Sequence, residues 1–262
     1  ALSIKPGYYG SVEKLGRMYL LATQFQRAES LYQMNVTAFG KPERGTARGW
    51  LVDLGNFQGK FNRTLRLADD CITANKLDGM ESVNWILYRK KGEIFDYLEM
   101  WDSAVANVRK SEELIAEFSP ADTGQCEIYY TRWFCRAGDL TRAACLLDRL
   151  LVLSRSNNSA SYWHAMGEIA LAKRDFPHAI ESFNRADSAY VWQPSNYRLA
   201  EAYLESGDAS SAIRVLEKLL KDYFELWKSS PYMGVTAHYL LGRAYEATGD
   251  KMKAQSSHEK FL

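Results

Sequence analysis

The sequence predicts an all-α protein built from repeated pairs of antiparallel helices. Three observations lead to this prediction. Small, apolar and aromatic residues recur along the 262-residue chain at intervals of 33 to 42 residues, and a small residue, usually alanine, stands twelve positions after the small residue that anchors each copy. Five of the six prolines stand where a repeat or a helix is expected to begin or end. Such a period is typical of architectures in which each unit buries its apolar face against its neighbours.

The copies are placed by a small anchor residue in the first helix of each pair. The spacings between successive anchors are 36, 40, 39, 36, 33 and 42 residues, for Gly16, Val52, Gly92, Thr131, Gly167, Ala200 and Gly242. Twelve positions after the anchors stand Ala28, Thr64, Ala104, Ala143, Ala179, Ala212 and Ala254. Packed helices approach most closely, to about 8 Å, where small residues face each other. The anchor and the residue twelve positions later are therefore predicted to meet where the two helices cross.

Glycine and aspartate mark the turn inside each pair. Gly59, Gly138, Gly207 and Gly249 stand seven positions after an anchor, where the first helix must end in a left-handed residue. Aspartates at the next position, which can cap the second helix, are Asp139, Asp175, Asp208 and Asp250. Pro177 is expected in the first turn of its helix. The prolines expected at junctions between repeats are Pro42, Pro120, Pro194 and Pro231.

These residues resemble the tetratricopeptide repeat family, whose unit is a helix–turn–helix of about 34 residues. The clearest copy contains Trp163, Gly167, Ala170, Asp175, Ala179, Phe183 and Ala186. The copy around Val52 departs from the family, because Gly55, Gly59 and Thr64 fill positions usually held by an aromatic residue, glycine and alanine. The resemblance implies a right-handed superhelix of about fourteen helices. It implies one domain over 8–262, with repeats at 9–40, 45–78, 85–118, 124–154, 160–192, 193–223 and 235–262.

The charge balance excludes several classes of partner. With 33 Lys+Arg and 32 Asp+Glu, the net charge of +1 provides no general attraction for nucleic acid or anionic lipid. No apolar run approaches the roughly 20 residues of a membrane-spanning helix. The four cysteines, which fall in apolar-periodic segments and are expected to be buried and reduced, are Cys71, Cys126, Cys135 and Cys145. Reduced thiols favour a cytoplasmic location.

No pattern of residues predicts catalysis, a metal site or a cofactor. The segment Gly55–Phe61 is one residue too short between its glycines for a phosphate-binding loop, and Phe61 replaces the required Ser or Thr. The four histidines contain no pair spaced for zinc. We therefore expect a non-enzymatic protein without cofactor. The ends of the sequence suggest a piece of a longer protein, and the expected lack of a polar helix before Phe261 allows self-association through that end.

The family resemblance also implies where a ligand binds. In that family the concave face is lined by the first helix of each repeat, at positions close to the anchor. Carried over to this sequence, the positions give Arg89, Glu93, Asp96, Arg132, Arg136, His164, Glu168, Tyr197, Glu201, Tyr239 and Arg243. The alternative for any one of these residues is a solvated charge or a weak ion pair. The residue after each anchor is never Asn, which argues against the clamp that some family members use for chaperone tails.

Two functions remain open on the sequence. The first is a protein–protein interaction scaffold that binds a peptide or a protein domain, as part of a larger regulatory or signalling protein; the domain could belong to the same chain. The alternative is a regulatory sensor domain that binds a small ligand or a peptide signal.

Overall fold

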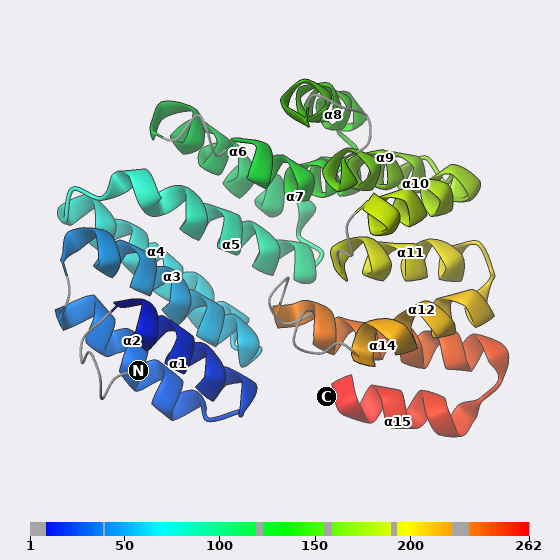
Figure 1. The fold of residues 1–262 in the computed structure, drawn as a ribbon, viewed down its shortest axis with the longest axis horizontal. Coiled ribbons are helices and arrows are strands. Elements are labelled where there is room, and N and C mark those ends of the chain that lie inside the picture. The colour runs from blue at the N-terminus through cyan, green and yellow to red at the C-terminus, as the bar shows by residue number, and fades with distance from the viewer. Residues whose placement is uncertain are drawn as a thin grey trace. The chain divides into compact units, whose positions relative to one another are not determined.

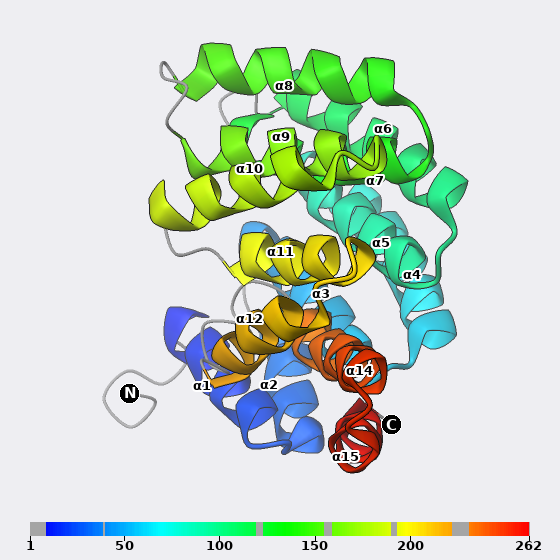
Figure 2. The same ribbon diagram turned by 90° about the vertical axis from the view of Figure 1, so that its right-hand side faces the viewer.

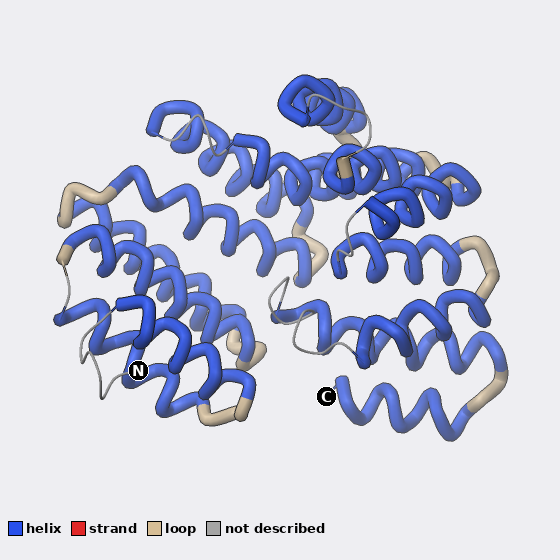
Figure 3. Tube along the Cα trace, in the orientation of Figure 1, coloured by secondary structure: helices blue, strands red, loops and turns tan. Residues whose placement is uncertain are grey.

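The computed structural model describes residues 9–38, 40–118, 123–154, 159–189, 193–221 and 231–261. These residues form helices and turns without a strand (Figure 3), so the predicted all-α class is confirmed. They divide into two compact units, unit 1 (Ala1–Thr123) and unit 2 (Gly124–Leu262). A single domain over 8–262 and the handedness of the superhelix stay predictions.

Unit 1 consists of consecutive helix pairs (Figure 1). Its helices are α1 (Tyr9–Leu21), α2 (Phe25–Ala38), α3 (Lys41–Phe57), α4 (Phe61–Leu77), α5 (Asn84–Tyr97) and α6 (Trp101–Phe118), with a short 3-10 helix, η1 (Glu81–Val83), before α5. We call the first helix of a pair the A helix and the second the B helix.

Unit 2 continues the alternation of A and B helices (Figure 2). Its helices are α7 (Thr123–Arg136), α8 (Leu140–Ser154), α9 (Ala160–Ala172), α10 (Phe176–Ala189), α11 (Gln193–Glu205), α12 (Ala209–Lys221), α14 (Pro231–Thr248) and α15 (Lys251–Phe261). The A helices of this unit are α7, α9, α11 and α14. None of the helices in the described ranges is long and apolar enough to cross a membrane.

The predicted left-handed turn is confirmed, and it also occurs in the copies that have no glycine at this position. The predicted left-handed glycines have φ of 65°, 80°, 89° and 83° at Gly59, Gly138, Gly207 and Gly249. The same position in the remaining copies holds Thr23, Glu99 and Arg174, with φ of 55°, 57° and 59°. All seven copies therefore end the A helix with one backbone conformation, including the copy around Val52 that departs from the family pattern.

The predicted aspartate caps are present at the starts of four B helices. The Oδ1 atoms of Asp139, Asp208 and Asp250 accept bonds from the backbone N–H three residues later, at 3.0, 3.0 and 3.1 Å. Asp175 accepts the equivalent bond at 3.4 Å. Each bond satisfies one backbone donor that a helix start leaves without an intrahelical partner.

The helix crossing also contains a ring that the sequence did not predict. The residues twelve positions after the anchors are buried, as expected, and at Gly16, Gly167 and Gly242 the side chain nearest to the glycine is a ring sixteen positions later. A Cβ atom on Gly16, Gly167 or Gly242 would lie 2.4, 2.5 and 2.4 Å from an atom of Tyr32, Phe183 and His258. The A helix thus needs glycine because a ring of the B helix fills the space of its side chain.

Three of the four prolines predicted at junctions between repeats lie in the first turn of an A helix, where a repeat begins, as predicted. They are Pro42 in α3, Pro194 in α11 and Pro231 in α14, while Pro120 lies outside the described residues. Pro177 lies in the first turn of α10 as predicted. The first turn tolerates proline because its N–H groups have no intrahelical acceptor.

The prediction that all four cysteines are buried is wrong. Cys71 and Cys135 are buried, but Cys145 is exposed, and the side chain of Cys126 lies outside the described residues. Val152 on the same helix as Cys145, α8, is also 77% exposed, so not all apolar residues of this helix are covered.

Self-association through the last described helix stays a prediction. On α15, lysine, glutamine, serine and glutamate side chains are exposed together with Met252, which is 84% exposed.

Candidate functional site

The described part of unit 2 contains a cluster of charged and polar side chains that links three A helices. We call it the charged cluster; its members are Arg136 on α7, His164 and Glu168 on α9, and Ser195, Arg198 and Glu201 on α11. The helical register explains the grouping. His164 with Glu168 and Arg198 with Glu201 are spaced four and three residues apart, so each pair shares one helix face.

Arg198 is the centre of the charged cluster. Its Nε and Nη2 atoms donate to Oε1 and Oε2 of Glu168 at 2.6 and 2.7 Å, which is a bidentate ion pair. Its Nη1 atom donates to Glu201 on the same helix. The other oxygen of Glu201 accepts from Nη2 of Arg136 at 2.9 Å. Side chains of α7 and α11 therefore meet, although α9 lies between these helices in the chain.

The buried charges shift each other's pKa. Burial raises the pKa of Glu168, but Arg198 and His164 outweigh burial and hold it at about 2. The pKa of Glu201 is also lowered, because Arg198, Arg136 and Arg132 outweigh burial. Both glutamates are consequently ionised at neutral pH, and the arginines around them carry the opposite charge.

Three residues of the charged cluster form a hydroxyl–imidazole–carboxylate chain. Nδ1 of His164 is hydrogen-bonded to Oγ of Ser195 at 3.0 Å, and Nε2 lies 3.4 Å from Oε1 of Glu168. The order resembles a hydrolase triad. Ser195, His164 and Glu168 are, however, only 0%, 3% and 1% exposed, so a substrate cannot reach the hydroxyl. Burial also lowers the pKa of His164 to about 4, too low for an efficient general base at neutral pH. These three side chains therefore stabilise the packing of α9 against α11, and their burial excludes a role in hydrolysis.

The charges of the cluster lie at two depths. Glu168 and Arg198 have side chains that are 1% and 3% exposed, whereas those of Glu201 and Arg136 are 14% and 31% exposed. Arg132, one turn before Arg136 on α7, is partly exposed. Each depth thus holds one carboxylate and one guanidinium group, and Arg136 is the more exposed member of the outer pair.

The remaining A helix of unit 2 presents two exposed residues at equivalent positions. Tyr239 and Arg243 on α14 correspond in register to His164 and Glu168 on α9 and to Tyr197 and Glu201 on α11. Tyr239 is 42% exposed, and its ring lies 5.8 Å from that of His258 on α15. Tyr197 is buried, which raises its pKa to about 12, and it is hydrogen-bonded to Thr236, so α11 and α14 are joined.

The other predicted site residues lie in unit 1. Arg89 and Glu93 form an ion pair along α5, and Asp96 is partly buried on the same helix. Lys90, which the sequence did not single out, pairs with Asp53 on α3. The predicted residues therefore form two groups, one on α5 in unit 1 and one on the A helices of unit 2.

Sequence reasoning missed Ser195 and Arg198. Only the positions that line the concave face in the resembled family were considered, and Ser195 and Arg198 are not among them. Helical spacing could have found them step by step, because Arg198 stands three residues before Glu201 and Ser195 stands three residues before Arg198.

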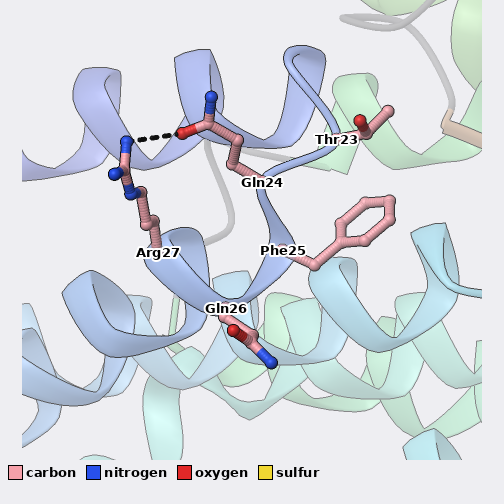
Figure 4. Close-up of a pocket in the computed structure, with 5 residues that line it drawn as sticks. All are labelled: Thr23, Gln24, Phe25, Gln26 and Arg27. Atoms are coloured by element: carbon pink, nitrogen blue, oxygen red, sulfur yellow. Dashed lines mark hydrogen bonds between the residues drawn. The ribbon is translucent and has the colours of Figure 1, made fainter.

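Two open cavities lie away from the charged cluster. One of about 510 Å³, at the turn between α1 and α2, is lined by Thr23, Gln24, Phe25, Gln26 and Arg27 (Figure 4). Nη1 of Arg27 donates to Oε1 of Gln24 there at 2.9 Å. The other, of about 420 Å³, is lined by Glu246, Lys251, Ala254, Gln255, His258 and Glu259. Within the described ranges, no three His, Cys, Asp or Glu side chains are grouped to hold a metal ion.

Comparison with known proteins supports the family resemblance. A tetratricopeptide repeat family model matches residues 197–254, which include most of α11, all of α12 and α14, and the start of α15. Comparison with curated protein sequences gives no match.

Solved structures of the same fold are distant in sequence. A tetratricopeptide repeat protein from Parabacteroides merdae matches with a TM-score of 0.55 and 15% identity, over 97% of this chain and 91% of that one. A STAND protein with a tetratricopeptide repeat sensor from Pyrococcus horikoshii has a TM-score of 0.57 and 13% identity, over 99% and 43%. The APC/C hetero-tetramer Cut9–Hcn1 has a TM-score of 0.56 and 14% identity, over 100% and 50%. This chain thus spans half or less of the latter two chains. These likenesses show that the chain has the fold of tetratricopeptide repeat proteins.

Proposed function

We propose that this tetratricopeptide repeat chain is a non-catalytic interaction module that binds a polypeptide on the A helices of unit 2, as part of a larger regulatory or signalling protein. The observation that carries the proposal is that Tyr239 and Arg243, one turn apart on α14, are exposed. The equivalent positions on α9 and α11 hold His164, Glu168 and Glu201 of the charged cluster. Partly exposed aromatic and arginine side chains are the residue types most often found at the energetic centres of protein interfaces.

The rigidity of the neighbouring helices supports this proposal. The ion pairs among α7, α9 and α11 fix the A helices before a partner arrives, so that binding orders few side chains. A surface prepared in this way suits an extended peptide or a protruding element of a domain, and it requires no catalytic group. We place the module in the cytoplasm, in keeping with its reduced buried thiols.

Selection from a displayed library of random short peptides tests the proposal. Peptides enriched on the 262-residue chain are expected to lose about tenfold or more in affinity on Tyr239→Ala, and to weaken on Arg243→Gln. Arg214→Gln is the matched control, since Arg214 is exposed on the B helix α12 and its Nη2 atom donates to Oγ of Ser211 on the same helix. Failure to enrich any peptide, or a loss with Arg214→Gln alone, contradicts the proposed surface.

The second candidate is a sensor domain for a small ligand. The observation in its favour is the cavity of about 510 Å³ beside Phe25, a size suited to small molecules. Five consecutive residues of one turn line it, without polar groups converging from other helices. A thermal shift with a metabolite library that disappears on Phe25→Ala would favour the sensor function over peptide binding.

A further inference from the structure

We propose that a lysine or arginine side chain of the polypeptide partner enters the cavity between α14 and α15, at the end next to Tyr239, and pairs there with Glu246 and Glu259. The inference rests on the proposed function, because it names a side chain that the partner carries when it lies on α14.

The position of the cavity is the first support. Its volume is about 420 Å³, and its lining residues belong to α14, to α15 and to the first turn of α15. His258 on α15 connects it to the proposed surface, because this side chain lines the cavity and its ring lies 5.8 Å from the ring of Tyr239. A peptide that covers Tyr239 therefore lies beside one end of the cavity.

The second support is that this end of the cavity is already organised. A Cβ atom on Gly242 would lie 2.4 Å from the ring of His258, so the ring packs directly against the backbone of α14. Nε2 of His258 is hydrogen-bonded to Oε1 of Glu246 at 3.2 Å. The side chain of Glu246 is nevertheless 59% exposed. His258 thus orients the carboxylate, and a partner can still reach it.

The third support is the charge of the lining. Glu246 and Glu259 are both exposed and line the same cavity. Within the ranges that the structure describes, neither forms an ion pair with a lysine or an arginine. Oε1 of Glu259 accepts from the neutral amide of Gln255 at 2.9 Å, which leaves its negative charge in place. A cation from a partner would gain charge-assisted hydrogen bonds to both carboxylates.

The chain's own cations stand apart from these carboxylates. Lys251 lines the cavity too, but it stands eight residues before Glu259 on one helix, which separates their backbones by about 12 Å. Lys260 follows Glu259 directly, so its side chain leaves the helix about 100° away. Arg243 stands three residues before Glu246 without forming an ion pair with it. The acidic end of the cavity is therefore the end nearest to Tyr239.

A lysine or arginine side chain fits this cavity better than a metal ion does. These side chains have an apolar stem and a charged end, and Ala254, which is 4% exposed, provides an apolar contact at the base of the cavity. In the part of the chain that the structure describes, three carboxylate, imidazole or thiol groups are nowhere gathered to hold a metal ion.

Titration of the full chain with a fluorescent peptide of alternating glycine and lysine tests the inference. Binding should weaken with added salt, and Glu246→Gln and Glu259→Gln should each reduce the affinity by about twofold to fivefold. Glutamine keeps the hydrogen-bonding capacity of each side chain, and circular dichroism establishes that the variants are folded. Glu181→Gln removes the same charge from the exposed face of the B helix α10 and should leave the affinity unchanged. Equal effects of all three variants, or tighter binding of spermidine than of the peptide, would overturn the inference.

A peptide selected on the chain separates this inference from the proposed function. Its lysines and arginines are replaced by norleucine one at a time. One replacement should weaken binding to the original chain and have no effect on the double variant Glu246→Gln/Glu259→Gln, because the two sides of the contact are coupled. If no position behaves in this way while binding still depends on Tyr239, the cavity is not used and the proposed surface stands. If no peptide can be selected, both proposals are wrong.

Discussion

Three residues hold a backbone conformation that their side chains disfavour. Thr23, Glu99 and Arg174 have positive φ at the turn where the other four copies have glycine. A left-handed residue with a side chain costs about 1 kcal/mol relative to glycine. These positions are therefore sites where the chain can be stabilised without a change of contacts.

We predict that Arg174→Gly raises the free energy of unfolding by about 0.5–1 kcal/mol. Gly207→Ala, the reverse change at the equivalent position, should lower it by about the same amount. A Cβ atom on Gly207 meets no atom within 4 Å, so this effect is purely conformational. Urea denaturation measures both changes, and stabilisation by Gly207→Ala would contradict the backbone explanation.

Two buried asparagines in unit 1 provide a contrast. Asn35 is 0% exposed, and neither polar atom of its side chain has a hydrogen-bond partner. Asn75 is equally buried, but its Oδ1 atom accepts from Arg48 at 2.6 Å and its Nδ2 atom donates to Asn84 at 2.8 Å. An unsatisfied buried polar group costs free energy that a satisfied one does not.

We predict that Asn35→Leu stabilises the protein by about 1–3 kcal/mol and that Asn75→Leu destabilises it by a similar amount. Thermal unfolding followed by circular dichroism measures both variants. A lower melting temperature for Asn35→Leu would show that the amide of Asn35 is satisfied in solution, for example by a water molecule.

The buried histidine makes stability depend on pH. The pKa of His164 falls from 6.5 to about 4 on folding, because burial disfavours the charged ring. Between these values the unfolded chain takes up a proton that the native chain does not, so stability falls as pH decreases. Above pH 6.5 the ring is neutral in both states and this contribution is fully present.

We predict that His164→Asn flattens the fall in unfolding free energy between about pH 6.5 and pH 5. Glu168, whose pKa is about 2, loses its own contribution only below its unfolded value of 4.5, outside this range. Denaturant titrations at several pH values measure the slope. An unchanged slope in the variant would assign the acid sensitivity to another group.

At the scale of a helix pair, the size of the anchor residue on the A helix can be compared with the size of the residue sixteen positions later on the B helix. Gly167 faces the ring of Phe183, while other copies carry Ala200 with Leu216, or Val52 with Ala68, at the same two positions; these pairs share core clusters. In these three copies a larger residue on the A helix accompanies a smaller one on the B helix, as close packing favours.

We predict that Gly167→Ala costs about 1–3 kcal/mol, because its Cβ atom would lie 2.5 Å from the fully buried ring of Phe183. Adding Phe183→Leu should recover part of this loss, so that the double variant is more stable than the sum of the single changes predicts. Strict additivity, measured by urea denaturation, would mean that the two residues do not share the crossing.

The helices were predictable from the sequence because their signals are local. Gly138 with Asp139 marks a turn by backbone preference and capping, and Ala143 marks a crossing by size alone. The ring over Gly167 was not identified, since it depends on the rotation of the B helix. The exposure of Cys145 was missed for a related reason: the periodicity of α8 does not tell which of its apolar residues the neighbouring helices cover.

The candidate site was predictable only in part. The family register located Arg136, His164 and Glu201, but their arrangement as a buried network depends on Arg198, which lies outside that register. Whether a charge such as Glu168 is solvated or desolvated depends on three helices from different repeats. Residue type and spacing therefore predicted which residues share a helix face, and three-dimensional packing determines which of their side chains reach the solvent.

At the scale of the whole molecule, the ion pairs of the charged cluster hold helices of unit 2 in place, and the surface that we propose for binding is small. The charged cluster holds α7, α9 and α11 together, and Tyr239 and Arg243 extend the same face on α14. If the chain binds polypeptides on this face, a bound peptide lies close enough to position 239 to be crosslinked there. It does not lie close enough to the B helices to be crosslinked to them.

Photo-crosslinking decides this point. A benzophenone amino acid replaces Tyr239 in one sample and His178, an exposed residue of the B helix α10, in another. Irradiation with a library-selected peptide should give an adduct at position 239 and none at position 178. Adducts at position 178 alone, or none at position 239 under saturating peptide, would contradict binding on the A helices of unit 2.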